Sequence, residues 1–386
     1  MRVSTKSFQL QWLSNFNSRP IGLNQIQRQV STGRRIAAAA DDPAGAAQAT
    51  LLQQGLDRLE NFKTSAATAA RRLSIEESVL DKITDSLDRV RELTIQANNG
   101  KLDTGSRNAI GAEVNEILAG IIGLANTQDG EGRYLFSGNR VKTQPFTENG
   151  GTIVYNGDDG VRLERIGDQR NIAEGHPGSD VFMAIRNGNG TFAVSADAAN
   201  TGTAYFQNPT VTDPSAWVTD NYTITFTAPG TYDVTDSGGA VVSSGSFTPG
   251  DTINFNGAAV VIEGSPATGD RFDVTPSRFQ SMFETLGNFA TALRQGTELN
   301  STLLDLDRAL ENISNTRSVV GSRLAVIDDQ GDTNDELTIQ LQQTLSGIQD
   351  VDLASAISSL QQQMTSLEAA QKVFAQTSSL SLFRVL

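Results

Sequence analysis

The sequence contains no cysteine and only one histidine, His176. Disulfide bonds, thiolate catalysis and cysteine-ligated zinc or iron–sulfur sites are therefore excluded, and a single histidine cannot form a multi-histidine metal site. Aromatic residues make up only 6% of the 386 residues and hydrophobic residues 38%. This composition favours slender helical or β-rich parts over one large globule. We expect an elongated molecule with two or three domains.

Positive charge and long apolar runs are also scarce. The chain has 30 Lys and Arg against 44 Asp and Glu, a formal net charge of −14. Nucleic acid and anionic membranes are excluded as partners, because they require a concentrated basic surface. The longest strongly apolar run, residues 117–125, is much shorter than the roughly 20 residues that a transmembrane helix needs. The N-terminus lacks an apolar signal-peptide core, which indicates a cytoplasmic protein or export by another route.

Apolar residues repeat every seven positions in the segments that flank the middle of the chain. One line consists of Leu52, Leu59, Ala66, Leu73, Leu80 and Leu87, and its companion of Phe62, Ala69, Ile83 and Val90, interrupted by Glu76. These lines predict a coiled-coil helix over residues 52–97, followed by a second helix from about Thr104. The period returns at Ser277, in Phe279, Leu286 and Leu293 and then in Leu303, Leu310 and Leu324, alongside a companion line of Leu306, Ile313, Val320 and Ile327. We expect the two helical ends of the chain to pack on each other, since an uncovered stripe is unstable.

The middle of the chain has the pattern of β structure. Residues 152–155 and 161–166, joined by Asn-Gly-Asp-Asp-Gly, predict a β-hairpin. Alternating segments at 222–226 and 258–262 predict a small separate β domain.

The predicted fold is mainly α with an inserted β domain. It comprises an elongated antiparallel helical bundle or coiled coil formed by the N- and C-terminal segments, a β-hairpin region and a distal small β domain. The predicted division is a terminal helical assembly domain (1–42 plus 333–386), a helical rod domain with the hairpin (43–188 plus 276–332) and an outer β domain (189–275).

Asp41 and Asp42 precede Pro43, and two adjacent carboxylates could serve acid/base chemistry or metal binding. However, Asp is a favoured helix N-cap and Pro is favoured at the first helical position. Gly33 follows a helical pattern and suits a helix C-terminus. We therefore predict that Gly33, Asp41, Asp42 and Pro43 form a helix cap and domain joint. No nucleophile, histidine or third ligand accompanies the pair, so no catalytic, cofactor-binding or metal site is predicted.

Other charged residues also receive structural interpretations. The acidic run at 328–336 predicts a break between two helices, with Asn334 or Asp335 as a cap, in preference to a calcium site. We interpret His176 as a solvated loop residue. The pairs Arg34-Arg35 and Arg71-Arg72 are interpreted as helix-surface or interface charges.

The terminal helical stripes are rich in glutamine and only thinly apolar, as in residues 25–30 and 360–364. A stripe of this kind buries too little apolar surface for a stable isolated coiled coil. One interpretation is that these segments are frayed helix ends. The interpretation with a functional consequence is that they become ordered only when they pack against other subunits. The predicted assembly interface consists of Leu23, Ile26, Val30, Leu353, Ile357, Leu360, Met364, Leu367 and Phe374.

Several stretches resemble the bacterial flagellin superfamily, and within it the hook-associated proteins of the hook–filament junction. They are MRVST at the start, QRQVSTGRRI (27–36), DDPAGAAQA (41–49), residues 72–100, LANTQDGEGRYLFSGN (124–139), VYNGDDG (154–160) and the tail from Asp350. The resemblance covers residues 1–185 and 277–386. It implies an extracellular location in the flagellum, reached by flagellar type III export.

The partners that the resemblance implies are other copies of the chain, the preceding hook-associated protein, flagellin, an export chaperone and the export apparatus; it implies no cofactor. One departure is Pro20, which costs about 3 kcal/mol inside a helix and predicts a break in the first helix.

The resulting hypothesis is a non-enzymatic structural subunit at the hook–filament junction, assembled through its terminal helices. One alternative is flagellin, the filament subunit. Others are a β-tipped adhesin or fibre protein and, from another class, a cell-wall hydrolase embedded in the appendage.

Overall fold

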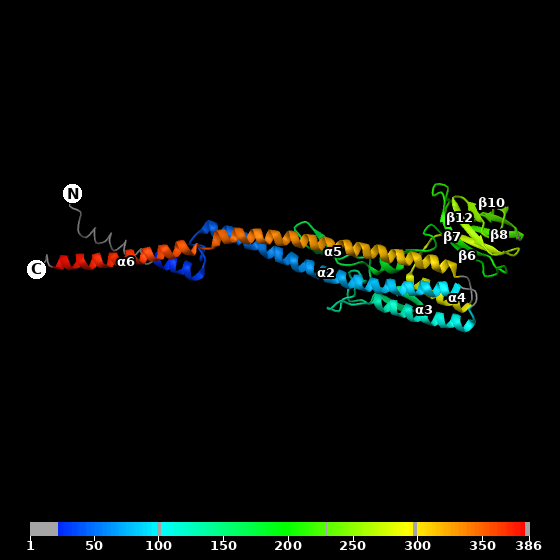
Figure 1. Cartoon of the computed structure of the whole chain (residues 1–386), viewed down its shortest axis with the longest axis horizontal. Coiled ribbons are helices and arrows are strands. Elements are labelled where there is room, and N and C mark those ends of the chain that lie inside the picture. The colour runs from blue at the N-terminus through cyan, green and yellow to red at the C-terminus, as the bar shows by residue number, and fades with distance from the viewer. Residues whose placement is uncertain (1–21, 99–101, 229, 296–298, 383–386) are drawn as a thin grey trace. The chain divides into compact units, whose positions relative to one another are not determined.

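The computed structural model describes residues 22–98, 102–228, 230–295 and 299–382 (Figure 1). The chain forms two compact units: unit 1 comprises Met1–Thr64 and Gln330–Leu386, and unit 2 comprises Ser65–Asp329. Helices α2 (Pro43–Asn98) and α5 (Asn300–Gln349) contribute residues to both units. The predicted break at Pro20 lies outside the described residues, and the three-domain division stays a prediction.

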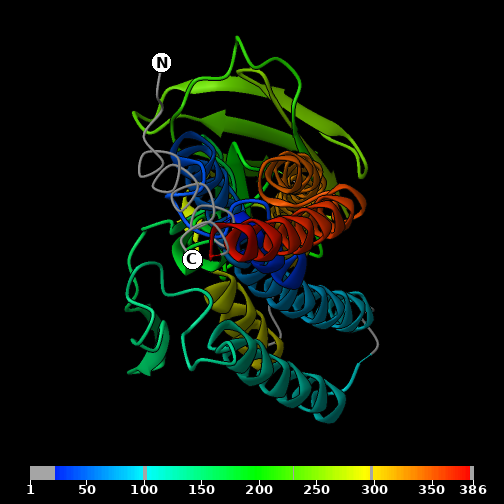
Figure 2. The same ribbon diagram turned by 90° about the vertical axis from the view of Figure 1, so that its left-hand side faces the viewer.

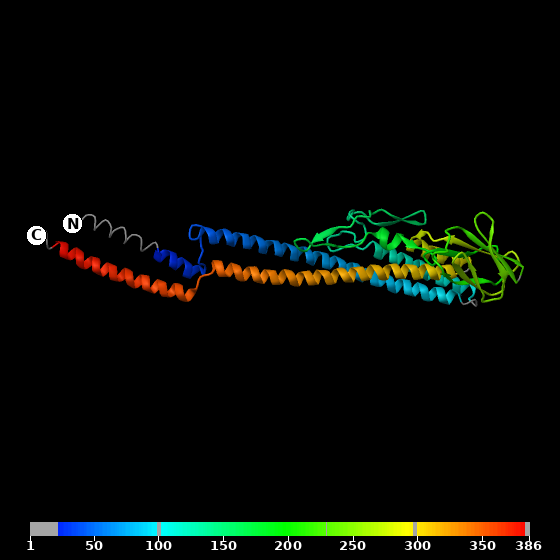
Figure 3. The same cartoon turned by 90° about the horizontal axis from the view of Figure 1, so that it is seen from above.

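Unit 1 is built from helices. A helix over residues 22–32 lies beside α6 (Leu353–Leu382), as Figure 3 shows, and a Cβ added to Gly22 would lie 3.5 Å from Gln363 Oε1. The N-terminal part of α2 contacts α5, because a Cβ added to Gly55 would lie 3.2 Å from Leu341 Cδ1. The unit therefore contains two helix pairs, each joining an N-terminal segment to a C-terminal one.

The predicted helix break at 328–336 is wrong, because α5 runs without interruption from Asn300 to Gln349. Asn334 does not cap a helix; it is buried inside α5, where Gln330 Nε2 donates to its Oδ1 at 3.0 Å. The break lies instead at residues 350–352. There Asp352 Oδ1 accepts the backbone N–H of Ala354 at 3.0 Å, an N-terminal cap of α6.

The helical part of unit 2 confirms the seven-residue lines. Leu73, Leu80 and Leu87 of α2 are fully buried, and so are Leu306, Ile313 and Val320 of α5, all in one core. Helix α3 (Thr104–Ala125) begins after Asp103, whose carboxylate accepts Ser106 N–H at 2.7 Å. It packs against α4 (Met282–Gln295), as Figure 2 shows. Among the described residues, α3 alone is long and apolar enough to span a membrane by length and composition.

The predicted hairpin between residues 152–155 and 161–166 is wrong, because these two segments do not pair with each other. β2 (Thr152–Tyr155) pairs with β1 (Phe146–Asn149), while β3 (Leu163–Arg165) pairs with β4 (Asn171–Ala173). The β1–β2 turn is Gly150-Gly151, with φ values of +60° and +83° that suit a tight primed turn. Residues 156–160 form a loop in which Asp158 accepts backbone N–H groups from Asn139 and Gly160. Strand β5 (Ile185–Arg186) follows a π-helical turn at Ser179–Met183 and pairs with β14 (Phe279–Gln280). Phe279 is thus not helical and is 60% exposed.

The predicted β strands at 222–226 and 258–262 are confirmed. They belong to two antiparallel sheets, of order β10-β9-β8-β13-β6 and β11-β12-β7. The strands are β6 (Phe192–Ala196), β7 (Tyr205–Val211), β8 (Tyr222–Ala228), β9 (Thr231–Thr235), β10 (Val241–Ser246), β11 (Thr252–Phe255), β12 (Ala258–Glu263) and β13 (Arg271–Pro276). The two sheets share a core of their own, rich in phenylalanine and separate from the helical core.

Polar contacts connect the β strands to α5. Asn300 Nδ2 donates to Phe206 O at 2.8 Å, and Asp305 Oδ1 accepts Gly188 N–H at 2.7 Å. Asp305 is half-buried, and the burial of its carboxyl raises its pKa.

Candidate assembly interface

The two connecting segments between the helices of unit 1, residues 33–42 and 350–352, lie beside each other. After the helix at 22–32, Gly33 adopts a φ of +70°, which glycine accommodates without strain. Residues 33–35 then run beside residues 349–351: Val351 N–H donates to Gly33 O at 3.0 Å, and Arg35 N–H to Gln349 O at 2.6 Å. Main-chain hydrogen bonds therefore join the two connecting segments.

Asp41 and Asp42 both accept backbone N–H groups. Asp42 Oδ1 accepts the backbone N–H of Gly45 at 2.9 Å, as an N-cap residue does from the third residue after it. This hydrogen bond lowers the pKa of the Asp42 carboxyl. Asp41 Oδ2 accepts Ala38 N–H at 2.9 Å. This is the geometry of helix and turn capping. No group of three or more His, Cys, Asp or Glu that could hold a metal occurs among the described residues.

The sequence analysis interpreted Arg34-Arg35 as helix-surface or interface charges, and the structure places Arg35 at the centre of this joint. Its Nη2 donates to Ile348 O at 2.7 Å, at the C-terminal end of α5. Its Nη1 lies 3.3 Å from Asp42 Oδ2. A cation at a helix C-terminus is favourable, and Arg35 thus contacts the end of α5 and the cap of α2 together.

The predicted interface residues of α6 divide into two sets. Leu353, Ile357 and Met364 are 48%, 45% and 46% exposed. Leu360 and Leu367 are half-buried. The side chain of Phe374 lies outside the described part of the structure. In the helix at 22–32, the predicted residues Leu23, Ile26 and Val30 are all half-buried.

Unit 1 has few buried apolar side chains. In its described residues five hydrophobic side chains are buried: Ile36, Ala49, Leu59, Phe62 and Ala356. Seven large hydrophobic side chains are exposed: Leu51, Leu337, Ile339, Leu353, Ile357, Met364 and Val373. The sequence prediction omitted four of these, although Leu337 and Ile339 stand out as apolar residues in a polar stretch. Unit 2 differs in this respect, because its buried apolar residues form large continuous cores.

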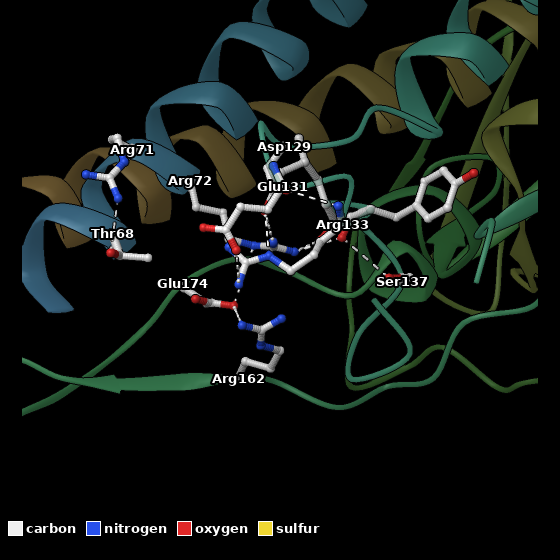
Figure 4. Close-up of polar contacts among 11 residues, drawn as sticks. Thr68, Arg71, Arg72, Asp129, Glu131, Arg133, Ser137, Arg162 and Glu174 are labelled. Atoms are coloured by element: carbon white, nitrogen blue, oxygen red, sulfur yellow. Dashed lines mark hydrogen bonds and ion pairs between the residues drawn. The ribbon is translucent and has the colours of Figure 1, made fainter. Parts of the chain in front are cut away.

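Unit 2 contains a buried cluster of charges, shown in Figure 4. Arg72 of α2 is only 4% exposed, and its Nη1 lies 2.9 Å from Asp129 Oδ2. Glu174 is 1% exposed, with Oε1 at 2.7 Å from Arg162 Nη2 and 3.6 Å from Arg72 Nε. Burial lowers the pKa of the Arg72 guanidinium. The interpretation of Arg72 as a surface or interface charge is therefore wrong, because a buried cation requires these acidic partners.

The interpretation of His176 as a solvated residue is also wrong. Its side chain is 14% exposed, and Nδ1 lies 2.7 Å from Oε1 of Glu76, which is itself 2% exposed. Glu76 is the residue that interrupts the apolar line of α2. The interruption is thus a buried polar contact between α2 and the loop at 174–178.

The comparisons with known proteins agree with this architecture. Residues 3–141 match the bacterial flagellin N-terminal helical region, and residues 195–276 match the D2-like domain of flagellar hook-associated protein 1. A solved structure of Xanthomonas campestris FlgL is 32% identical, with a TM-score of 0.71; the match covers 76% of this chain and 99% of that one. The flagellar junction protein FlgL of Legionella pneumophila is 31% identical, with a TM-score of 0.72, over 78% of this chain and 100% of that one.

The chain belongs to the FlgL family of flagellar hook-associated proteins. Flagellar hook-associated protein 3 of Escherichia coli is 23% identical over 385 residues, covering 100% of this chain and 99% of its relative. The resemblance to the flagellin superfamily is therefore confirmed, and its hook-associated branch is favoured over flagellin. The mainly helical fold with an inserted β domain is confirmed as well.

Proposed function

We propose that this FlgL-family chain is a structural subunit of the hook–filament junction of the bacterial flagellum, incorporated through the apolar side chains of unit 1. The observation that carries the proposal is the balance within that unit, where exposed large hydrophobic side chains outnumber the buried ones. Its partners would be further copies of the chain, the preceding hook-associated protein and flagellin. The chain would act by packing, without catalysis.

The energy available for packing is substantial. Full burial of a large apolar side chain is worth about 1.5–3 kcal/mol. Leu353, Ile357, Met364 and Val373 of α6 are each about half exposed, so covering the four would contribute roughly 3–6 kcal/mol per subunit. Head-to-tail contacts of this kind continue from subunit to subunit, as closed two-fold contacts do not.

Within unit 1, the joint of residues 33–35 and 349–351 would set the direction of the terminal helix pair. Main-chain bonds and Arg35 hold the joint, and the Asp41 and Asp42 carboxylates hold the start of α2. We infer delivery by flagellar type III export with a chaperone, on the basis of family membership.

The test is removal of residues 351–386 in a motile strain. We expect the truncated chain to be folded and exported, with unit 2 intact, but absent from purified flagella. Normal filaments that contain the truncated chain would refute the proposal. A useful control is the pair Val218→Ser and Val241→Ser, which alters exposed β-domain residues and should leave incorporation unchanged.

The position in the appendage is tested by electron microscopy with an antibody to the β domain. A band confined to the hook–filament boundary is expected. Labelling along the whole filament would indicate flagellin. The enzyme alternative is tested with the Asp41→Ala, Asp42→Ala double variant. Flagella that carry this variant should cleave peptidoglycan no less than wild-type flagella, and a loss of cleavage would support the alternative.

A further inference from the structure

A groove lies between α3, α4, the β1–β2 hairpin and β14. Its volume is about 820 Å³, and its apolar lining includes Leu118 and Ile122 of α3, Ile153 of β2, and Phe279 and Phe283. Phe279 is 60% exposed, although its ring faces the Arg186 guanidinium at 4.7 Å. A large aromatic side chain left half in water at the edge of a groove is a feature of binding surfaces.

Three glycines of α3 and α4 have open space around them, and of these Gly287 lines the groove. A Cβ added to Gly120 or Gly123 of α3, or to the groove residue Gly287 of α4, would meet nothing within 4 Å. Glycine inside a helix costs about 1 kcal/mol relative to alanine. Most of α3 is uncovered, since its buried residues are only Ile110, Gly111, Val114, Ile121 and Ala125. Small residues on an uncovered apolar helix permit close approach of another backbone.

A matching ridge occurs on the same unit. Val161 and Leu163, in and just before β3, are 46% and 61% exposed. Two exposed basic residues flank them: Arg140, whose Nε lies 3.8 Å from Asp158 Oδ2, and Arg165, which donates to the Gly167 and Asp168 carbonyls. Because Leu163 is exposed in the single chain, the ridge is not seated in the groove of its own molecule.

The groove has charges of the opposite sign. Glu148 of the hairpin and Glu284 of α4 line it, and both are exposed. Glu284 is paired with Arg278 at 3.2 Å, so the charge complementarity rests on Glu148. An apolar ridge with basic flanks therefore meets an apolar groove with an acidic rim, which is the complementarity that fixes register between two surfaces.

We propose that this groove receives the ridge of Arg140, Val161, Leu163 and Arg165 from a second copy of the chain. The contact is heterologous, since ridge and groove are different surfaces of one molecule. It rests on the proposed function, because copies must lie side by side in the junction for it to form. It adds a copy-to-copy contact in unit 2 to those proposed for the terminal helices of unit 1.

The test uses the full-length chain with p-benzoylphenylalanine in place of Asn288, an exposed residue of α4 that lines the groove. Purified flagella are irradiated, and the adducts are mapped by mass spectrometry. We expect an adduct between two copies, mapping to residues 139–165 of the second copy. The same photoreactive residue at Val218 of the β domain should give no such adduct.

Each other outcome counts against a defined statement. An adduct to flagellin or to another hook-associated protein, an adduct to a different segment, or incorporation without any adduct would overturn the ridge-and-groove contact alone. A chain that is absent from the flagella would overturn the proposed function, and this contact with it.

A charge exchange gives a second measurement. Glu148→Arg and Arg140→Glu each place like charges together and should lower the adduct yield at least about fivefold. The double variant should restore it. Both side chains are exposed, so neither substitution should prevent folding, and a double variant as weak as the single ones would refute the pairing.

Discussion

The buried charge cluster makes a sharp prediction for Glu174→Ala. The Glu174 carboxylate is 1% exposed and lies 2.7 Å from Arg162 Nη2 and 3.6 Å from Arg72 Nε. Removing one member of a buried ion pair costs about 3–5 kcal/mol, because the remaining charge stays buried without its counterion. Arg72 keeps Asp129 at 2.9 Å and the Tyr134 carbonyl at 2.8 Å. We therefore expect the lower end of that range, about 3 kcal/mol.

The matched control is Glu131→Ala. Glu131 belongs to the same cluster through Arg133, at 3.2 Å, but its side chain is 65% exposed. An exposed pair contributes at most about 1 kcal/mol. Glu131 lies only two positions from Asp129, the partner of Arg72. The same amino-acid change at Glu131 should nevertheless have little effect on stability.

The assay is urea unfolding with two signals. Far-UV circular dichroism follows the helices, and fluorescence of Trp217, which stacks on Phe192 at 5.1 Å, follows the β domain in a Trp12→Phe background. Glu174→Ala should move the helical transition to lower urea and leave the Trp217 transition in place. A loss below about 1 kcal/mol, or one equal to that of Glu131→Ala, would refute the reasoning.

Three further predictions address the interface, the β-domain contact and the loop beside the cluster. Ile357→Asp should lower incorporation into flagella about tenfold or more, because assembly would bury an unpaired charge. Gln362→Asp on the same helix should change incorporation little, and equal effects of the two variants in an incorporation assay would count against the interface. Burial raises the pKa of Asp305, so ionisation above that pKa costs stability, and the wild type should gain stability relative to Asp305→Asn as the pH falls from 7 to 4, measured by urea titration; a difference independent of pH would contradict this. Gly138→Ala should cost at least about 2 kcal/mol in the same titration, because φ is +65° and the added Cβ would lie 2.1 Å from Asp158 O; an unchanged midpoint would contradict it.

Local patterns in the sequence predicted much of the helical architecture. The line through Leu73, Leu80 and Leu87 identified buried positions of α2, because a period of seven keeps one face of a helix toward its partner. The start of α2 was equally predictable, since Asp42 and Pro43 act on the next turn of the same helix. The prediction from the acidic run at 328–336 was wrong, because helix α5 tolerates Gly331 and the acidic side chains of the run are exposed to solvent.

The choice of partner was not predictable. Both Gly150-Gly151 and the loop at 156–160 suit a turn, and only the tertiary structure selects β1 rather than β3 as the partner of β2. The four apolar side chains exposed on unit 1 but absent from the predicted interface depend likewise on which faces the neighbouring helices cover.

The sequence by itself determined the helical lines, the start of α2 and the family, since each depends on residues close together or on long similar stretches. The tertiary structure alone decided which charges are buried. Arg72 meets Asp129 and Glu174, and Glu76 meets His176, across 57 to 102 positions of the chain. A charge can leave water only where opposite charges converge on it, and that convergence is a property of the fold.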